Sequence, residues 1–352
     1  MRIIKLKEIT EDIIKEIITG LNQDKLIIYP TETSYGVGVN ALSKVAVSKL
    51  LKYKNRPAGK AISVAVASKD QAEELIETNV QATNILTNFL PGPITVIAKS
   101  RGIVDSRLES ELGTLGIRIP AFDFLLELLA KYALPITATS ANYSGGATPY
   151  NIDKLLESLP AKSKDLIDII IDAGELEHNP PSLVIDTTQT NKVYRSGVVE
   201  PEDLTAQTII SNSATETKLI AQKLITKYLP TVANMLITLE GELGAGKTQF
   251  VSGIGAALGI KEIINSPTFT IVKEYDFMTP QNQGKLYHLD LWRLTTPTSL
   301  ESLGIEAQAD NLAIICVEWP DQLLIDSNYK IIKIKLFKIN QKSRRIIIRP
   351  LF

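Results

Sequence analysis

The sequence predicts an α/β protein made of two unlike domains, and three observations support this. Short apolar runs rich in β-branched residues alternate with helical patterns, an order that produces sheets covered by helices. The length of 352 residues exceeds what a single hydrophobic core usually needs. The density of apolar runs also falls over residues 197–217, which divides the chain.

The first part of the chain is expected to alternate strands and helices. The expected helices cover 42–53, 70–79 and 122–132. The expected strands are LIIYP (26–30), ITVIA (94–98), GIRIP (116–120), ITATS (136–140) and LVIDT (183–187).

The divider, GVVEPEDLTAQTIISNSATET (197–217), is rich in Thr, Ser, Pro and Glu, which is typical of a linker, and a new helical pattern begins near Thr215. Beyond it we expect strands at 235–239, 286–291 and 312–317, and a helix at 247–258. We therefore predict a first domain over 1–205, a linker over 206–214 and a second domain over 215–352.

Composition restricts the class of protein. A single cysteine, Cys316, excludes a disulfide framework and a Cys-rich metal site. The N-terminal stretch MRIIKLKEITEDIIKEI is charged throughout, and a long uncharged stretch (132–152) is rich in Ser, Thr, Asn and Gly. We therefore expect neither a signal peptide nor a membrane span. These features predict a soluble, cytoplasmic protein.

Charge is distributed unevenly, although the formal net charge is only −1. Residues 33–69 contain seven basic residues and no acidic one, and the tail after Asp326 contains eight basic residues and no acidic one. Both runs can be solvated faces of the protein. The alternative is an anion site in the first run and a weaker contact surface in the tail.

The second domain contains GELGAGKT (241–248), which matches the phosphate-binding loop G-x-x-x-x-G-K-[ST] and lies between an apolar strand and a helix. Its glycines let backbone N–H groups point at phosphate oxygens, and the helix adds the positive end of its dipole. Lys247 is expected to reach the β- and γ-phosphates, and the Thr248 hydroxyl to ligate Mg²⁺. The predicted ATP-binding residues of this loop are Gly241, Gly244, Ala245, Gly246, Lys247 and Thr248.

A phosphate loop also needs an acidic group at the end of a neighbouring strand. Glu318 follows six apolar residues in LAIICVEWP, as expected at the mouth of a buried strand. Asp290 lies on an alternating strand and could be either a site residue or a surface charge. Thr268, in NSPTFTIVKEY, could contact phosphate or metal. His288 is assigned no chemistry, because a histidine in such a strand is more often a packed residue.

These motifs together resemble the TsaE family of small ATPases over about residues 213–352. They read GAGKT (244–248), SPTF (266–269), HLDLWR (288–293) and EWP (318–320). Trp292 replaces the usual Tyr and Gln249 the usual second Thr. The resemblance implies a P-loop NTPase-like α/β domain in which Thr248 and Glu318 bind Mg²⁺, while Thr268 and Asp290 lie close to ATP.

Three polar segments in the first domain lie at expected strand ends or turns. YPTETSYGVG (29–38) combines hydroxyls and glycines, KYKNRPAGK (52–60) places cations around a Pro-Gly turn, and TATSANYSGGATP (137–149) is a hydroxyl-rich loop after a strand. Ligands of α/β proteins bind outside the carboxyl ends of strands, and Arg forks onto phosphate oxygens. Jointly the segments predict a nucleotide site without a Walker sequence. No nucleophile–His arrangement stands out, so adenylation by positioning and electrostatics would fit.

The same segments resemble the YrdC/TsaC family of threonylcarbamoyl-adenylate synthases over essentially residues 1–200. The family motifs read PTETSYGVG (30–38), KNRP (54–57), PGPIT (91–95), GIRIP (116–120), SANYSG (140–145) and RSG (195–197). The resemblance implies an open, twisted α/β domain. Such a domain would convert ATP, L-threonine and bicarbonate, with Mg²⁺, into threonylcarbamoyl-AMP and pyrophosphate.

The resemblance also implies two groups of ligand-binding residues. Threonine would be held by Thr31, Thr33, Arg118 and Ser182, and ATP by Lys54, Arg56, Lys60, Ser140, Asn142, Thr148 and Arg195. Arg118 would be the bidentate partner of the threonine carboxylate. Two departures from the family, KAIS at 60–63 and Ala65 where some members carry His, could shift the threonine contacts.

Both families serve one tRNA modification. The resemblance implies that a separate TsaD–TsaB transferase uses the adenylate to modify the adenosine beside the anticodon, that the ATPase docks on this transferase, and that contact with tRNA is indirect.

The basic segment 33–69 also motivates an alternative, an RNA-binding module fused to a regulatory ATPase. Residues 1–205 contain more acidic than basic residues, which disfavours a broad RNA surface. A small-molecule kinase is disfavoured because about 140 residues leave little room for a lid and an acceptor site.

Overall fold

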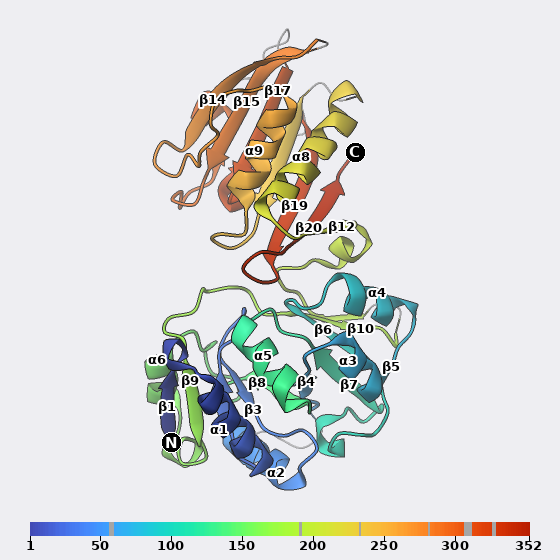
Figure 1. The fold of residues 1–352 in the computed structure, drawn as a ribbon, viewed down its shortest axis with the longest axis vertical. Coiled ribbons are helices and arrows are strands. Elements are labelled where there is room, and N and C mark those ends of the chain that lie inside the picture. Colours follow the sequence, from blue (N-terminus) through green and yellow to red (C-terminus); the bar gives the residue numbers. More distant parts are fainter. Residues whose placement is uncertain (56–59, 190–191, 232–233, 281, 306–311, 326–328) are drawn as a thin grey trace. The chain divides into compact units, whose positions relative to one another are not determined.

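Figure 1 shows the chain as a computed structural model, which describes residues 1–352 except 56–59, 190–191, 232–233, 281, 306–311 and 326–328. The chain divides into two compact units, Met1–Leu204 and Thr205–Phe352. Both units combine helices with sheets, which confirms the predicted α/β class. In the described part of the chain, none of the helices combines the length and apolar character needed to cross a bilayer.

The described strands of the first unit form one mixed sheet in the order β1-β9-β2-β3-β8-β4-β7-β6-β10-β11, with β5 beside β6. Four neighbouring pairs are parallel, namely β1 with β9, β9 with β2, β4 with β7 and β6 with β10. The strands are β1 (Arg2–Lys5), β2 (Ile27–Tyr29), β3 (Gly36–Gly38), β4 (Ser63–Ala65), β5 (Ile76–Glu77), β6 (Ile94–Ser100), β7 (Thr114–Arg118), β8 (Ile136–Ser140), β9 (Ile169–Asp172), β10 (Leu183–Asp186) and β11 (Lys192–Arg195).

Helices cover this sheet through apolar residues spaced at one helical turn. In α1, Ile14, Ile17 and Leu21 are buried, and the Thr10 hydroxyl caps the helix by accepting from the Ile13 N–H. α1 and α5 share one hydrophobic core with strands β2 and β9. The helices of the unit are α1 (Glu11–Asn22), α2 (Lys44–Lys54), α3 (Lys69–Leu75), α4 (Val80–Asn88), α5 (Asp123–Tyr132), α6 (Ile152–Ser158) and α7 (Ala161–Lys164).

The second unit contains a seven-stranded sheet within its described residues, in the order β12-β20-β19-β13-β17-β15-β14. The adjacent strands β19, β13, β17 and β15 are parallel, so their carboxyl ends lie at one edge. The strands are β12 (Gln207–Ser211), β13 (Met235–Glu240), β14 (Val272–Met278), β15 (Gln283–Asp290), β17 (Leu312–Glu318), β19 (Lys330–Lys338) and β20 (Arg344–Pro350). Two short strands, β16 (Thr298–Ser299) and β18 (Leu323–Leu324), pair separately.

Helices α8 (Ala214–Tyr228) and α9 (Lys247–Ala257) lie side by side over one face of this sheet (Figure 1). Side chains of β13 alternate between the two faces, because successive residues of a strand point in opposite directions. Met235, Ile237 and Leu239 pack with the two helices, whereas Leu236 packs in a second core with the segment after β15. The central strand is therefore buried on both sides, which fits its continuous apolar run.

The structure corrects the linker that the sequence predicts over 206–214. Residues Gln207–Ser211 form β12, an edge strand that pairs antiparallel with β20 from Gln207 opposite Ile348 to Ser211 opposite Arg344. Ile209 of this strand packs against the core of the second unit. The strand QTIIS is missed when this segment is judged by its average composition. A five-residue strand changes that average little when its neighbours are polar.

Candidate functional site

A cavity of about 440 Å³ in the first unit opens among the loops that leave the sheet. β7 and β8 end in it with Arg118 and Ser140, and the loop after β2 supplies two threonines. Ten of the predicted site residues line this cavity: Thr31, Thr33, Lys54, Lys60, Arg118, Ser140, Asn142, Thr148, Ser182 and Arg195. Arg56, the remaining residue predicted for the site, lies outside the described residues.

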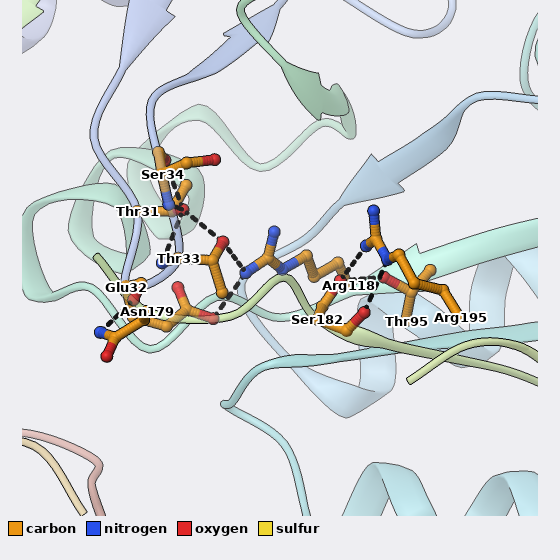
Figure 2. A network of polar contacts seen from close by, with 9 residues as sticks. All are labelled: Thr31, Glu32, Thr33, Ser34, Thr95, Arg118, Asn179, Ser182 and Arg195. Carbon is orange, nitrogen blue, oxygen red and sulfur yellow. Dashed lines mark hydrogen bonds and ion pairs between the residues drawn. The ribbon is translucent and has the colours of Figure 1, made fainter. Parts of the chain in front are cut away.

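The turn after β2 is organised by the Thr31 hydroxyl. Its Oγ1 donates to the Ser34 carbonyl at 2.7 Å and accepts from the N–H groups of Thr33 and Ser34, both at 3.2 Å. Such a closed turn fixes the backbone of the residues between, so the Thr33 side chain has a defined direction. That direction is toward Arg118, whose Nη2 donates to Thr33 Oγ1 at 2.9 Å (Figure 2).

Arg118 also forms a buried ion pair that the sequence did not predict. Its Nη2 lies 2.7 Å from Glu32 Oε1, and both side chains are largely shielded from solvent. The Asn179 Nδ2 donates to the Glu32 carbonyl at 3.0 Å and so holds the acidic residue by its backbone (Figure 2). Arg118 Nε and Glu32 Oε2 are buried, and no hydrogen-bond partner for either atom is found among the described residues. The pair therefore retains unused hydrogen-bonding capacity beside the cavity.

A second arginine, Arg195 at the end of β11, faces the same cavity. Its Nε donates to the Ser182 carbonyl at 2.9 Å and its Nη2 to Ser182 Oγ at 2.7 Å, while Thr95 Oγ1 lies 3.1 Å from that hydroxyl (Figure 2). Burial, and then the charge of Arg118, lower the pKa of the Arg195 guanidinium. Two guanidinium groups that repel each other across a cavity favour an anion between them.

The contact between Arg195 and Ser182 has a consequence for the predicted subsites. Ser182 was predicted to contact threonine and Arg195 to contact ATP. Since the two side chains are hydrogen-bonded, the two predicted subsites are continuous, and ligands in them would meet at this pair.

Lys54, at the end of α2, secures the loop after β8. The lysine is only 3% exposed, and its Nζ donates to the Ser140 carbonyl at 2.7 Å and to the Asn142 carbonyl at 2.5 Å. Within the loop, Ser140 Oγ donates to Asn142 Oδ1 at 2.6 Å, and Asn142 Nδ2 donates to the Gly146 carbonyl. The predicted phosphate ligand Lys54 thus shapes the hydroxyl-rich loop as well as lining the cavity.

A second cavity, of about 570 Å³, lies at the carboxyl edge of the sheet in the second unit. Its lining includes the predicted residues Gly244, Gly246, Lys247, Thr248, Thr268, Asp290 and Glu318. The other two predicted residues of the loop, Gly241 and Ala245, are not among the described residues that line this cavity. A Cβ at Gly241, whose φ is +147°, would lie 2.4 Å from the Leu336 carbonyl oxygen, so only glycine fits there.

Lys247 is folded back onto its own loop. Its Nζ donates to the carbonyls of Gly241 at 2.6 Å and Glu242 at 3.1 Å, and lies 3.9 Å from the centroid of the Trp319 ring. The side chain is 4% exposed. Phosphate oxygens would replace the carbonyl oxygens as acceptors when a nucleotide enters, since a charged acceptor forms the stronger hydrogen bond.

Two polar side chains contact Glu318 at the end of β17. Its Oε1 accepts from the Thr248 hydroxyl at 2.8 Å and lies 2.9 Å from His288 Nε2. His288 is fully buried, and no residue in the described part of the chain pairs with its Nδ1. The sequence assigned no chemistry to this histidine, but its contact orients Glu318, the predicted metal ligand. The signal available in the sequence was the H-x-D pattern formed by His288 and Asp290.

Asp290 belongs to the same cavity and is not a surface charge. It lies opposite Glu318 in the register of β15 and β17, and its Oδ2 accepts from Thr268 Oγ1 at 2.7 Å and from Ser266 Oγ at 3.2 Å. Hydroxyl and carboxylate oxygens are the ligands that Mg²⁺ prefers, with water and phosphate completing its shell. No cluster of three His, Cys, Asp or Glu side chains suited to a metal occurs among the described residues, which is compatible with such a partly hydrated ion.

Comparisons with known families match both units. The Sua5/YciO/YrdC family model, described as "Telomere recombination", matches residues 19–197. The model described as "Threonylcarbamoyl adenosine biosynthesis protein TsaE" matches residues 211–346. The second match begins at Ser211, the last residue of β12.

Individual relatives also match the chain. A Methanocaldococcus jannaschii protein is 33% identical over 209 residues, which are 58% of this chain and 96% of that protein. A Pyrococcus abyssi protein named threonylcarbamoyl-AMP synthase is 35% identical over 53% of this chain, and the match spans only 54% of its own length. Among solved structures, a variant of P. abyssi Sua5 is 28% identical with a TM-score of 0.53, covering 72% of this chain and 74% of that chain.

The match to the first family model spans half of the chain and contains all ten cavity-lining residues predicted from the sequence. The second match contains the phosphate loop and the Glu318 and Asp290 carboxylates. The chain therefore belongs to the Sua5/YciO/YrdC family and carries a TsaE-family domain fused behind it.

Proposed function

We propose that the first domain is a threonylcarbamoyl-AMP synthase, which converts ATP, L-threonine and bicarbonate into threonylcarbamoyl-AMP and pyrophosphate. The observation that supports this best is the continuous cavity that brings Arg118, Arg195 and the loop after β8 together. It has cations for a carboxylate and for phosphates, and it needs no protein nucleophile. The name of the P. abyssi relative supports the same reaction.

The residues of the cavity fit each step of this reaction. Bicarbonate carboxylates the threonine amino group with loss of water, and the new carboxylate oxygen attacks the α-phosphate of ATP. The bond from the α-phosphorus to pyrophosphate then breaks. Arg118, oriented by Glu32 and Thr33, would hold the threonine carboxylate. Lys60 and Arg195 would stabilise the charge that develops on pyrophosphate.

Pyrophosphate release tests the first proposal. In the full chain, release should require both threonine and bicarbonate, and an Arg118→Gln variant should lose it while keeping its fold by circular dichroism. Release that continues without threonine would reject the assignment.

We further infer that the second domain binds ATP with Mg²⁺ through Lys247, Thr248 and Glu318, and hydrolyses it to support a TsaD–TsaB transferase. Transfer to tRNA would be carried out by that complex. A surface feature supports docking beside the nucleotide: Leu243, Phe269 and Trp292 come from three loops around the second cavity and are 80%, 86% and 61% exposed. Exposed apolar side chains grouped in this way mark interaction sites.

ATP hydrolysis, alone and with TsaD–TsaB added, tests the second proposal. Hydrolysis should be slow for the chain alone and faster with the complex. A Lys247→Ala variant should lose hydrolysis yet keep threonine-dependent pyrophosphate release. If both activities disappear together in a folded variant, the two sites are not independent and the proposal is wrong.

A further inference from the structure

The basic tail sends one arginine to the phosphate loop. Arg344, the first residue of β20, donates from Nη2 to the Gly244 carbonyl and from Nε to the Ala245 carbonyl, both at 3.1 Å. Its Nη1 donates to three carbonyls of the turn between β19 and β20, those of Asn340 at 2.8 Å, Gln341 at 3.3 Å and Ser343 at 3.0 Å. One guanidinium thus joins that turn to the loop 241–248.

These contacts fix the orientation of two peptide groups in the loop. In a trans peptide the carbonyl and the following N–H point in opposite directions. With the Ala245 carbonyl held by Arg344, the Gly246 N–H must point the other way, and Gly246 lines the cavity. With the Gly244 carbonyl held, the Ala245 N–H is directed back to the Glu242 carbonyl, which it reaches at 3.1 Å. Phosphate binding by such a loop depends on this inward direction of its N–H groups.

Arg344 is not needed to hold β20 in place. The strand is paired with both β12 and β19 along its length, and Ile346 and Ile348 are buried in the core. The arginine itself is only half-buried, so its removal leaves neither a large cavity nor a buried unpaired charge. Its side-chain donors are instead directed at main-chain carbonyls, two of which belong to the phosphate loop.

We propose that Arg344 is a positioning residue for nucleotide binding in the second domain: it holds the outer carbonyls of Gly244 and Ala245 so that the Gly246 N–H stays directed at phosphate. The inference rests on the proposed ATP binding by this domain. Lysine could not replace the arginine, because the contact uses the planar fork of Nε and Nη2 on two successive carbonyls, which a single ammonium cannot span.

The test measures ATP binding and hydrolysis in the full chain for the wild type, Arg344→Gln, Arg344→Lys and the matched control Lys342→Gln. The ATP binding that a Lys247→Ala chain loses defines the second site. We expect Arg344→Gln to weaken binding at that site about tenfold and to raise KM for ATP more than it lowers kcat. Arg344→Lys should weaken ATP binding at that site nearly as much, and Lys342→Gln should leave it unchanged. Threonine-dependent pyrophosphate release should be equal in all four chains.

Three outcomes are distinguishable. If Arg344→Gln binds ATP at the second site as tightly as the wild type, the positioning role is wrong while nucleotide binding stands. If Arg344→Gln lowers the melting temperature of the second unit and kcat falls in step with binding, the residue is merely structural and the inference fails. If the Lys247→Ala chain binds as many nucleotides as the wild type, the proposed function of the second domain fails first.

Discussion

The ion pair between Glu32 and Arg118 is the residue-scale feature with the clearest consequence for the first site. Glu32 is not among the described residues that line the cavity, but its carboxylate contacts Arg118, which does line it. We expect Glu32→Gln to raise KM for threonine about tenfold, since a charge-assisted hydrogen bond to the guanidinium is lost, with a smaller change in KM for ATP. Steady-state pyrophosphate release at varied threonine and at varied ATP concentrations measures both KM values.

A double variant identifies the route of this effect. If Glu32 acts by orienting Arg118, then Glu32→Gln should not weaken threonine binding further in an Arg118→Gln chain, where binding is measured directly because pyrophosphate release is lost. Glu77→Gln, which removes one partner of an exposed pair with Lys99, is the matched control and should leave both KM values unchanged. Additive losses in the double variant would contradict the positioning role.

A second residue-scale prediction concerns His288, for which a longer and a shorter amide side chain can be compared as replacements. Its Nε2 contacts Glu318 Oε1, and a glutamine amide reaches about as far as that nitrogen, whereas an asparagine amide reaches only as far as Nδ1. We expect His288→Gln to keep more ATP hydrolysis than His288→Asn, and the Asn variant to need a higher Mg²⁺ concentration. Hydrolysis titrated with Mg²⁺ measures this, and equal loss in both variants would contradict the proposed orientation of Glu318.

At the scale of elements, Arg107 joins the start of α2 to the short 3₁₀ turn η2 (Ser106–Leu108). Its guanidinium pairs with Asp105 Oδ1 at 2.8 Å and Oδ2 at 2.7 Å, and donates to the Lys44 carbonyl and the Ser48 hydroxyl. The hydrogen bond from Arg107 holds the pKa of the Asp105 carboxyl below its ordinary value of 3.8. A carboxyl whose folded pKa is depressed stabilises the fold above its unfolded pKa and loses this contribution as pH falls through the folded pKa.

We therefore expect Asp105→Asn to lower the free energy of unfolding of the first unit by about 1 to 2 kcal/mol at pH 7. The difference from the wild type should shrink steadily as pH falls below 3.8. Urea unfolding at pH 7 and at pH 3 measures it. The control is Asp12→Asn, whose partner Lys15 and carboxylate are both largely exposed, so it should have little effect at either pH. A difference that is constant with pH would exclude the charge as the cause.

Elements and loops differ in how far the sequence predicts them. The strand 136–140 coincides with β8, and helix 122–132 differs from α5 by one residue, because their patterns are long or clearly bounded. The predicted helix 70–79 instead ends at Leu75 and continues as the strand β5, and β9 was not predicted at all. A strand as short as β5, with two residues, carries too little periodicity to be read without its partner.

The residues that line the two cavities could be predicted where chemistry restricts the residue type, as in the loops 30–38, 140–145 and 241–248. The residues that orient them were not. Glu32 and Arg118 are 86 positions apart, and Arg344 is 100 positions from Gly244, so only the fold brings each pair together. Such partners are ordinary charged residues in the sequence, and their spacing carries no local pattern.

At the scale of the whole molecule, the connection between the two units is short. The 3₁₀ turn η3 (Pro201–Thr205) ends two residues before β12 begins at Gln207, so the tether is much shorter than the predicted linker 206–214. Each unit has its own core and its own cavity, and the residues of each cavity come from one unit alone. The two activities should therefore tolerate a change in the connection.

We expect a chain with ten Gly and Ser residues inserted after Ala206 to keep both threonine-dependent pyrophosphate release and ATP hydrolysis at wild-type rates. The inserted residues fall before the first pairing of β12 with β20, Gln207 with Ile348, so the edge strand is preserved. The same insertion after Ile209 interrupts that pairing and is the matched control, which should lose hydrolysis but keep pyrophosphate release. If the insertion after Ala206 abolishes either activity, that activity depends on the short connection between the units, and the two sites are not independent.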